Sequence, residues 1–347
     1  MTRPGHHNAL TDVPGVLVGH HGRAEDGWLS GTTVVVLPDG GALAAVDVRG
    51  GGPATRETAA LAPGFGGARA DAVVLTGGSA YGLAAADGVQ VWLEERRGTP
   101  DEPWVPLVPT AALFDLGRGG EVTARPGPDF GRAAAEAASG GPVPQGTVGA
   151  GTGAVTAEMK GGVGTASAVL PGGAVVGALA VVNAHGSTVD PWNGLPHAAA
   201  LGADGEFALR TPDTLEHTAA RRALAEPGRP AAGLQLPNTV IGVVATDAPL
   251  DHVALCRAAE AGHRGMARAV HPVHGPSDGD TVFALGVGPV GPADPALLAA
   301  VTHAAERTFA RAIVHAVLAA TSVPTPFGHI ASYRELYPQA TAALAAP

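Results

Sequence analysis

A threonine at position 239 stands where its hydroxyl could become a nucleophile. It opens the β-branched run Thr239–Thr246 (TVIGVVAT), and the Pro- and Gly-rich stretch 227–237 lies just before it. If the bond between Asn238 and Thr239 were cut, one residue would carry both a hydroxyl and a free α-amine. An α-amine titrates near ~7.7–8.0, so it can accept the hydroxyl proton close to neutral pH. The alternative is a threonine that only begins a strand.

Two carboxylates flank a single glycine in Asp278-Gly279-Asp280, directly before a run that predicts a strand over Thr281–Leu285. A turn can direct both side chains to one side, where they could hold an ammonium group or orient a hydroxyl. If they lie close together, each raises the pKa of the other, which suits proton transfer. A plain Asp-Gly turn is the alternative interpretation.

Three further side chains are candidates for a site. Asn183 follows the apolar segment Ala174–Val182, and a carboxamide fixed at a strand end is suited to stabilise an oxyanion. Lys160 is the only lysine in the chain, which indicates a position that needs an ammonium rather than a guanidinium. Tyr81 could offer its hydroxyl to a ligand. Alternatively, Asn183 only forms a turn, Lys160 stands there by chance, and Tyr81 is an aromatic side chain packed at the start of a helix.

Other ligand motifs are weak. The glycine-rich stretch 149–154 (GAGTGA) fits neither dinucleotide nor Walker spacing, and the 14 histidines form no zinc-binding pattern. We therefore expect neither cofactor nor metal. The net charge of −10 disfavours a nucleic-acid partner. A single cysteine, Cys256, excludes an intrachain disulfide, and neither a signal peptide nor a long apolar run is found. These features predict a cytoplasmic protein with no membrane partner.

Periodicity and turn residues predict the elements that must position these side chains. Thr32–Leu37 and Ala42–Val48 are expected to form a hairpin, and 190–237 to contain two weak strands. The other expected strands are Ala72–Leu75, Val163–Leu170 paired with Ala174–Val182, Thr239–Thr246 and Thr281–Leu285; the expected helices are Leu83–Arg96, Gly131–Ala138, Thr214–Ala225, Leu250–Val270 and Asp294–Ala320. This order is typical of an α+β protein with antiparallel or mixed sheets.

Several long motifs, in the same order over roughly residues 8–320, resemble one family. They are SGTTVVVLPDGGALAAVDVRGGGPATRET (30–58), AVVLTGGSAYGLAAADGVQVWLEE (72–95), PQGTVGAGTGA (144–154), KGGVGTAS (160–167), GALAVVNAHG (177–186), NTVIGVVATDAPL (238–250) and HPVHGPSDGDTVFAL (271–285). The chain resembles the self-processing aminopeptidases, which include L-aminopeptidase/D-esterase, β-peptidyl aminopeptidases and nylon-oligomer hydrolases.

The resemblance implies a single hydrolase domain over 1–347, with a four-layer αββα sandwich of the N-terminal-nucleophile hydrolase type that related ornithine acetyltransferases share. It implies self-cleavage between Asn238 and Thr239, which would leave subunits 1–238 and 239–347. The processed heterodimers are expected to assemble as a homo-oligomer, a tetramer in relatives.

The resemblance also implies roles. Thr239 is the expected nucleophile, Asp278 and Asp280 orient it, and Asn183 stabilises the oxyanion. Tyr81 lines the substrate site, and Lys160 belongs to the site in relatives that carry it, although the segment before it is shorter here than in the nylon-oligomer hydrolases. The substrate is a small peptide, an amino-acid amide or ester, or a 6-aminohexanoate oligomer. Acyl transfer to an amine such as ornithine, or an unprocessed binding protein, are the alternatives.

Overall fold

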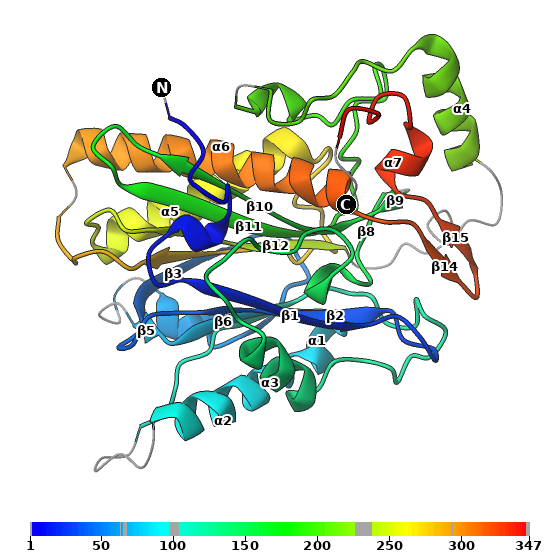
Figure 1. The fold of residues 1–347 in the computed structure, drawn as a ribbon. Coiled ribbons are helices and arrows are strands. Elements are labelled where there is room, and N and C mark those ends of the chain that lie inside the picture. Colours follow the sequence, from blue (N-terminus) through cyan, green and yellow to red (C-terminus); the bar gives the residue numbers. More distant parts are fainter. Residues whose placement is uncertain are drawn as a thin grey trace.

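Two β-sheets lie face to face, and helices cover the outer side of each, so the computed structural model has four layers (Figure 1). The structure describes residues 2–62, 64, 68–97, 104–157, 159–203, 205–225, 238–292 and 294–344. The Pro- and Gly-rich stretch predicted over Pro227–Pro237 lies outside these ranges. The αββα order that the resemblance implies is confirmed.

One sheet of the described residues has five strands, in the order β1 (Leu17–Arg23), β2 (Ser30–Val36), β6 (Ala72–Thr76), β7 (Thr110–Ala112) and β4 (Ala54–Arg56). The other has six, in the order β10 (Gly162–Val169), β11 (Val175–Asn183), β12 (Thr239–Thr246), β13 (Thr281–Gly286), β3 (Ala42–Val48) and β5 (Arg69–Ala70). The pairs β6–β7 and β12–β13 are parallel and the others are antiparallel, so the predicted mixed sheets are confirmed.

Within the described ranges, two of the longer helices pack on each sheet. On the six-stranded sheet these are α5 (His252–Ala269) and α6 (Pro295–Ala319), and on the five-stranded sheet α2 (Ala85–Arg97) and α3 (Pro128–Glu136). The remaining α-helices and strands of the described residues are α1 (Ser79–Gly82), α4 (Thr214–Ala225), α7 (Tyr333–Leu336) and the short pairs β8 (Val155–Thr156) with β9 (Met159–Lys160) and β14 (Val323–Thr325) with β15 (Gly328–Ile330). None of the helices in the described ranges is long and apolar enough to cross a bilayer.

Strand β12 lies in the middle of the six-stranded sheet and is buried on both faces. Val240 and Val244 pack into the core beneath α5 and α6, whereas Ile241 and Val243 pack into the core between the two sheets. A strand covered on both faces has a nearly continuous apolar sequence, which is why the run Thr239–Thr246 could be recognised from the residues alone.

The predicted hairpin of Thr32–Leu37 with Ala42–Val48 is wrong. Strand β2 pairs with β1 and β6, whereas β3 pairs with β13 and β5 in the other sheet. Both strands send apolar side chains into the core between the sheets, Val35 from one and Ala44 from the other. A Pro-Asp-Gly turn serves equally for a hairpin and for a crossing between stacked sheets, so the turn residues alone could not distinguish them.

The described part of 190–237 also departs from expectation. In place of two weak strands it holds an isolated bridge of Val189 with Pro196, a short 3₁₀ turn at Ala199–Leu201 and α4. The predictions for the helix Thr214–Ala225 and for the paired strands around residues 171–173 are confirmed.

Gly242 lets β12 lie against its neighbours. A Cβ at this position would come within 2.5 Å of the Leu179 carbonyl oxygen and 2.6 Å of the Phe309 ring. Because one of these atoms belongs to the backbone of β11, Gly242→Ala is expected to lower the free energy of unfolding by about 1–3 kcal/mol, measured by urea denaturation. Gly286→Ala on β13 is the matched control, since its Cβ would meet nothing nearer than 3.8 Å. Equal stability of the two variants would contradict this account.

Candidate active site

Three strand ends meet at one edge of the six-stranded sheet. Thr239 is the first residue of β12, and it pairs directly with Asn183, the last residue of the antiparallel β11. Asp280 immediately precedes β13, which runs parallel to β12 with Thr281 opposite Ile241. Thr239 and Asp280 are 56 and 97 positions from Asn183 in sequence, and strand direction brings them to it.

Thr239 and Asn183 lie on the face of the sheet that is turned toward the second sheet. Successive side chains of a strand alternate between faces, and Thr239 has the parity of Ile241, which packs between the sheets. Asn183 has the parity of Val181, which packs in the same layer. Thr239 is 4% exposed and Asn183 is fully buried, so the pair lies at the rim of the inter-sheet core.

The Asp278-Gly279-Asp280 turn bonds to the chain on both sides of Thr239. The Gly279 N–H donates to the Asn238 carbonyl oxygen at 3.1 Å, and the Asp280 carboxylate accepts the Val240 N–H at 2.7 Å. The absence of a side chain at Gly279 matters, because a Cβ there would lie 3.0 Å from the Thr239 Oγ1. Among the described residues, the Thr239 hydroxyl makes no hydrogen bond.

His274 holds the second oxygen of Asp280. Its Nδ1 lies 2.7 Å from Asp280 Oδ2, and its backbone N–H donates to the same oxygen at 3.1 Å. The ring packs edge-on against that of His263, whose Nε2 donates to the Asp47 carbonyl at 2.9 Å. Burial lowers the pKa of His263 to about 4, so this ring is neutral at pH 7 and adds no charge beside His274. His274 was not predicted as a site residue, although it lies within the HPVHGPSDGD motif.

One carboxylate oxygen of Asp278 has no partner in the described part of the chain. Its Oδ2 accepts the Gly275 N–H at 2.6 Å, whereas its buried Oδ1 has no hydrogen-bond partner among the described residues. Burial raises the pKa of Asp278 and the nearby charge of Asp280 raises it further, while His185 and His274 oppose this. An unpaired buried carboxylate oxygen is costly for stability, so it marks a position where a ligand or a proton is expected.

The Asn183 carboxamide is held with its oxygen facing inward. Its Oδ1 accepts hydrogen bonds from Arg118 Nη1 and, at 3.1 Å, from the Val155 N–H, while its Nδ2 donates to the Phe114 carbonyl at 3.3 Å. An amide nitrogen carries two protons, and no hydrogen bond to another described residue uses the second. Arg118 was not predicted, since a lone arginine in a glycine-rich turn gives no sequence signal.

Lys160 is fully buried, and its ammonium group donates to three carbonyls, those of Gly151 at 2.7 Å and of Ala154 and Gly161 at 2.8 Å. Burial lowers its pKa well below the usual value, and the charge of Arg118 adds to this. All three ammonium protons are used. Lys160 therefore reaches the site through the peptide that joins Ala154 to Val155, whose N–H bonds to Asn183.

Tyr81 lies apart from these contacts. It is 59% exposed on α1, and the Arg125 guanidinium stacks over its ring at 3.7 Å. No hydrogen bond joins its hydroxyl to another described residue. The structure thus brings Thr239, Asn183, Asp278 and Asp280 together, places Lys160 behind them, and does not join Tyr81 to them by a hydrogen bond.

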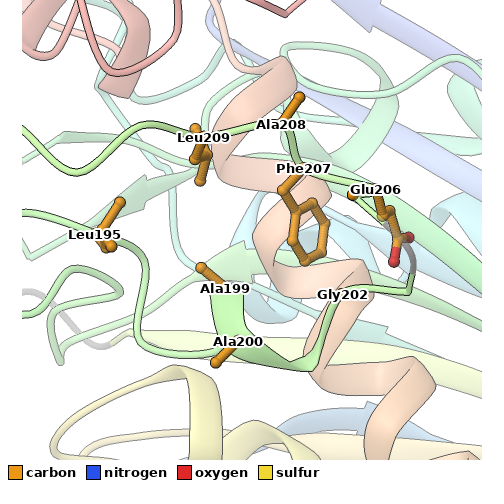
Figure 2. Close-up of a pocket in the computed structure, with 9 residues that line it drawn as sticks. Leu195, Ala199, Ala200, Gly202, Glu206, Phe207, Ala208 and Leu209 are labelled. Atoms are coloured by element: carbon orange, nitrogen blue, oxygen red, sulfur yellow. The ribbon is translucent and has the colours of Figure 1, made fainter.

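A surface pocket of about 340 Å³ involves other residues, from Leu195 to Leu209 (Figure 2). Its one charged side chain, Glu206, is bonded by Arg311 and His315, which hold the pKa of this carboxyl below its ordinary range although burial alone would raise it. The described residues that line this pocket offer no free reactive group, so the volume of the pocket alone does not make it a candidate active site. Within the described ranges, no group of three or more His, Cys, Asp or Glu side chains could hold a metal.

Comparisons with known proteins identify the family of this chain. Residues 8–331 match the model of peptidase family S58. The chain belongs to peptidase family S58. A Mycobacterium tuberculosis protein named as an uncharacterized aminopeptidase is 49% identical, covering 96% of this chain and 99% of its own length. A 6-aminohexanoate-oligomer endohydrolase of Kocuria sp. is 32% identical over 79% of this chain and 73% of its own length.

Solved structures of this type share the fold. The L-aminopeptidase D-Ala-esterase/amidase of Ochrobactrum anthropi, described as a variant of the Ntn hydrolase fold, matches with a TM-score of 0.76 and 24% identity, over 97% of this chain and 94% of its own. A β-aminopeptidase of a Burkholderia species matches with a TM-score of 0.74 and 24% identity, over 100% and 97%. The expected N-terminal-nucleophile fold is confirmed, and membership of the S58 family makes this protein an amidohydrolase.

Asp278 is expected to cost stability at neutral pH. The pKa of Asp278 in the folded protein lies above the usual 3.8. Between pH 3.8 and this raised pKa the folded protein binds more protons than the unfolded chain, so stability falls as the pH rises through this range. Asp278→Asn keeps an acceptor for Gly275 but cannot ionise. Its Tm should exceed that of the natural protein by about 1–3 °C at pH 7, and the gain should shrink toward pH 4.

The control for that comparison is Asp39→Asn, which removes an exposed carboxylate. It should shift Tm less than Asp278→Asn, with no comparable loss of the shift toward pH 4. A variant Asp278→Asn that is less stable than the natural protein at pH 7 would show that the carboxylate is compensated in the fold.

Proposed function

We propose that this protein is a self-processing threonine amidohydrolase, which cuts its own chain between Asn238 and Thr239 and then uses Thr239 as an N-terminal nucleophile. The observation that carries the proposal is that hydrogen bonds and strand pairing hold the chain on both sides of this peptide bond. Gly279 donates to the carbonyl before the bond and Asp280 accepts the N–H of Val240 after it, while Asn183 is paired with Thr239.

In the uncut chain, the Thr239 hydroxyl attacks the Asn238 carbonyl carbon. The C–O bond forms as the hydroxyl proton is lost, and negative charge develops on the carbonyl oxygen that Gly279 N–H already contacts. Collapse of this intermediate breaks the C–N bond and protonates the nitrogen, which moves the acyl group from nitrogen to oxygen. Water then hydrolyses the ester and leaves a carboxylate on Asn238 and a free α-amine on Thr239.

In the processed enzyme, the new α-amine takes the hydroxyl proton as Thr239 Oγ1 attacks a substrate amide. The free N–H of Asn183 stabilises the oxyanion, and the proton passes from the α-amine to the leaving amine. Water then attacks the acyl-enzyme ester and regenerates the hydroxyl. Asp280 fixes the backbone beside Thr239, and His274 in turn fixes Asp280.

The substrate must take the place of Asn238. Thr239 is 4% exposed in the continuous chain, and the Asn238 carbonyl occupies the acyl position of a substrate. Cleavage releases this residue from the covalent chain, so its place becomes available to a small acyl group. The names of relatives and of solved structures support small peptides, amino-acid amides and 6-aminohexanoate oligomers as the substrates to test. The tetramer of processed heterodimers stays a prediction.

Thr239→Ala is expected to leave a single full-length chain on a denaturing gel, because the attacking hydroxyl is lost. The natural protein should give two chains, the smaller beginning Thr-Val-Ile-Gly by N-terminal sequencing, and Thr239→Ser should still be cut. Thr246→Ala, at the other end of β12, is the matched control and should be processed. Cleavage at the same bond in Thr239→Ala would disprove the nucleophile assignment.

Gly279→Ala is expected to slow self-cleavage at least about 10-fold, followed by the loss of the full-length band with time. The added Cβ would lie 3.0 Å from Thr239 Oγ1 and 2.9 Å from the Gly52 carbonyl oxygen, so the turn must move away from the bond that it holds. Gly291→Ala, where a Cβ would meet nothing within 4 Å, should be processed at the natural rate. Self-cleavage of Gly279→Ala at the natural rate would show that Gly279 plays no part in the mechanism.

A substrate panel on processed protein tests the activity itself. Amino-acid p-nitroanilides, a β-dipeptide and linear 6-aminohexanoate oligomers are offered with and without ornithine as an acyl acceptor. Release of free acid from at least one amide supports hydrolysis. Acyl-ornithine as the main product would instead indicate an acyltransferase, and a chain that stays whole and turns over nothing would indicate a binding protein.

A further inference from the structure

Arg118 is a charged residue that the mechanism above does not use. It lies in the turn after β7, where its backbone N–H donates to the Asp115 carbonyl at 3.2 Å. Its Nη1 donates both to the Gly153 carbonyl and to Asn183 Oδ1, at 2.5 Å each. One guanidinium group therefore joins the turn after β7, the loop before β8 and the last residue of β11.

The first consequence concerns the direction of the Asn183 amide. An oxyanion donor must present nitrogen, and not oxygen, to the carbonyl under attack. Two donors, Arg118 Nη1 and the Val155 N–H, meet the oxygen end of this amide. Turning the amide over would bring its NH₂ group against both donors, so the arginine permits one orientation and directs Nδ2 to the other side.

The second consequence concerns charge. A cation on Oδ1 draws electron density from the amide and makes its N–H protons stronger donors, and this effect is large in a buried site of low dielectric. Burial lowers the pKa of Arg118 to about 10, while Asp115 favours its charged form, so the cation persists at neutral pH. Asp115 is 2% exposed and is itself fixed by the Gly78 N–H at 2.7 Å.

On the basis of the proposed role of Asn183, we propose that Arg118 is a positioning residue that orients and polarises the Asn183 amide for the negative charge of the tetrahedral intermediate. It touches neither the nucleophile nor the bond that is cut. Its contribution appears when charge develops on the carbonyl oxygen, so it acts on the chemical step and not on substrate binding.

A double-mutant cycle tests this coupling. The substrate is the p-nitroanilide that the processed natural protein hydrolyses fastest, and kcat is normalised to the processed fraction. Asn183→Ala should lower kcat by about 10²–10³-fold, as for other oxyanion donors. Arg118→Met should lower kcat by about 10–100-fold with KM changed less than about 3-fold, and the double variant should lie within about 3-fold of Asn183→Ala alone.

Two further variants separate charge from packing. Arg118→Lys keeps a cation and should recover part of the lost kcat, whereas Arg118→Gln keeps a donor without the charge and should recover less. Arg118→Gln also carries the cycle if Arg118→Met does not fold, as judged by circular dichroism. Arg132→Met, which removes a partly exposed arginine on α3, is the control and should retain the natural kcat.

The outcomes are distinct for the two proposals. If the losses of Arg118→Met and Asn183→Ala multiply in the double variant, or if only Asn183→Ala loses activity, the inference about Arg118 is wrong and the proposed function stands. If Asn183→Ala keeps its full kcat, the proposed role of Asn183 fails as well. Cleavage that stops in Arg118→Met but continues in Asn183→Ala would overturn the inference.

Discussion

The direct pairing of Asn183 with Thr239 across β11 and β12 is the contact on which the candidate site depends. Antiparallel pairing places the end of one strand beside the start of the next. The parallel pairing of β12 with β13 then brings the turn before β13 to the same edge. A slip of either register by one residue would turn one side chain to the opposite face of the sheet, so the buried core that fixes the register also fixes the site.

Gly279, between the two aspartates, explains how one turn can hydrogen-bond to the chain on both sides of the Asn238–Thr239 bond. Its N–H reaches the Asn238 carbonyl because no Cβ keeps the turn away from Thr239, and the aspartate that follows it reaches the Val240 N–H. The same turn leaves Asp278 with a buried oxygen that has no hydrogen-bond partner among the described residues. Functional sites commonly retain such unfavourable groups, and the surrounding sheets supply the stability that permits them.

Behind the strand edge, a buried group of charges holds the amide of Asn183 without touching Thr239. Arg118 contacts the amide directly, and Lys160 contacts the peptide whose N–H bonds to it. The single lysine thus donates to three backbone carbonyls, and these acceptors of the surrounding loop explain why its ammonium group can be buried. Asp115 offsets part of the positive charge of Arg118 and Lys160, so the buried charges here are of both signs.

The sequence by itself determined the elements whose signal is local. The run Thr239–Thr246 and the helix Thr214–Ala225 were recognisable because burial on two faces and helical periodicity leave a pattern in adjacent residues. The motifs also named Thr239, Asn183, Asp278 and Asp280, which the fold brings to one edge. Tertiary structure alone decided that β2 and β3 belong to different sheets, because a Pro-Asp-Gly turn fits both arrangements. It also decided that His274 supports Asp280 and that Arg118 holds Asn183, since hydrogen bonds between distant segments depend on packing and leave no periodic trace in the chain.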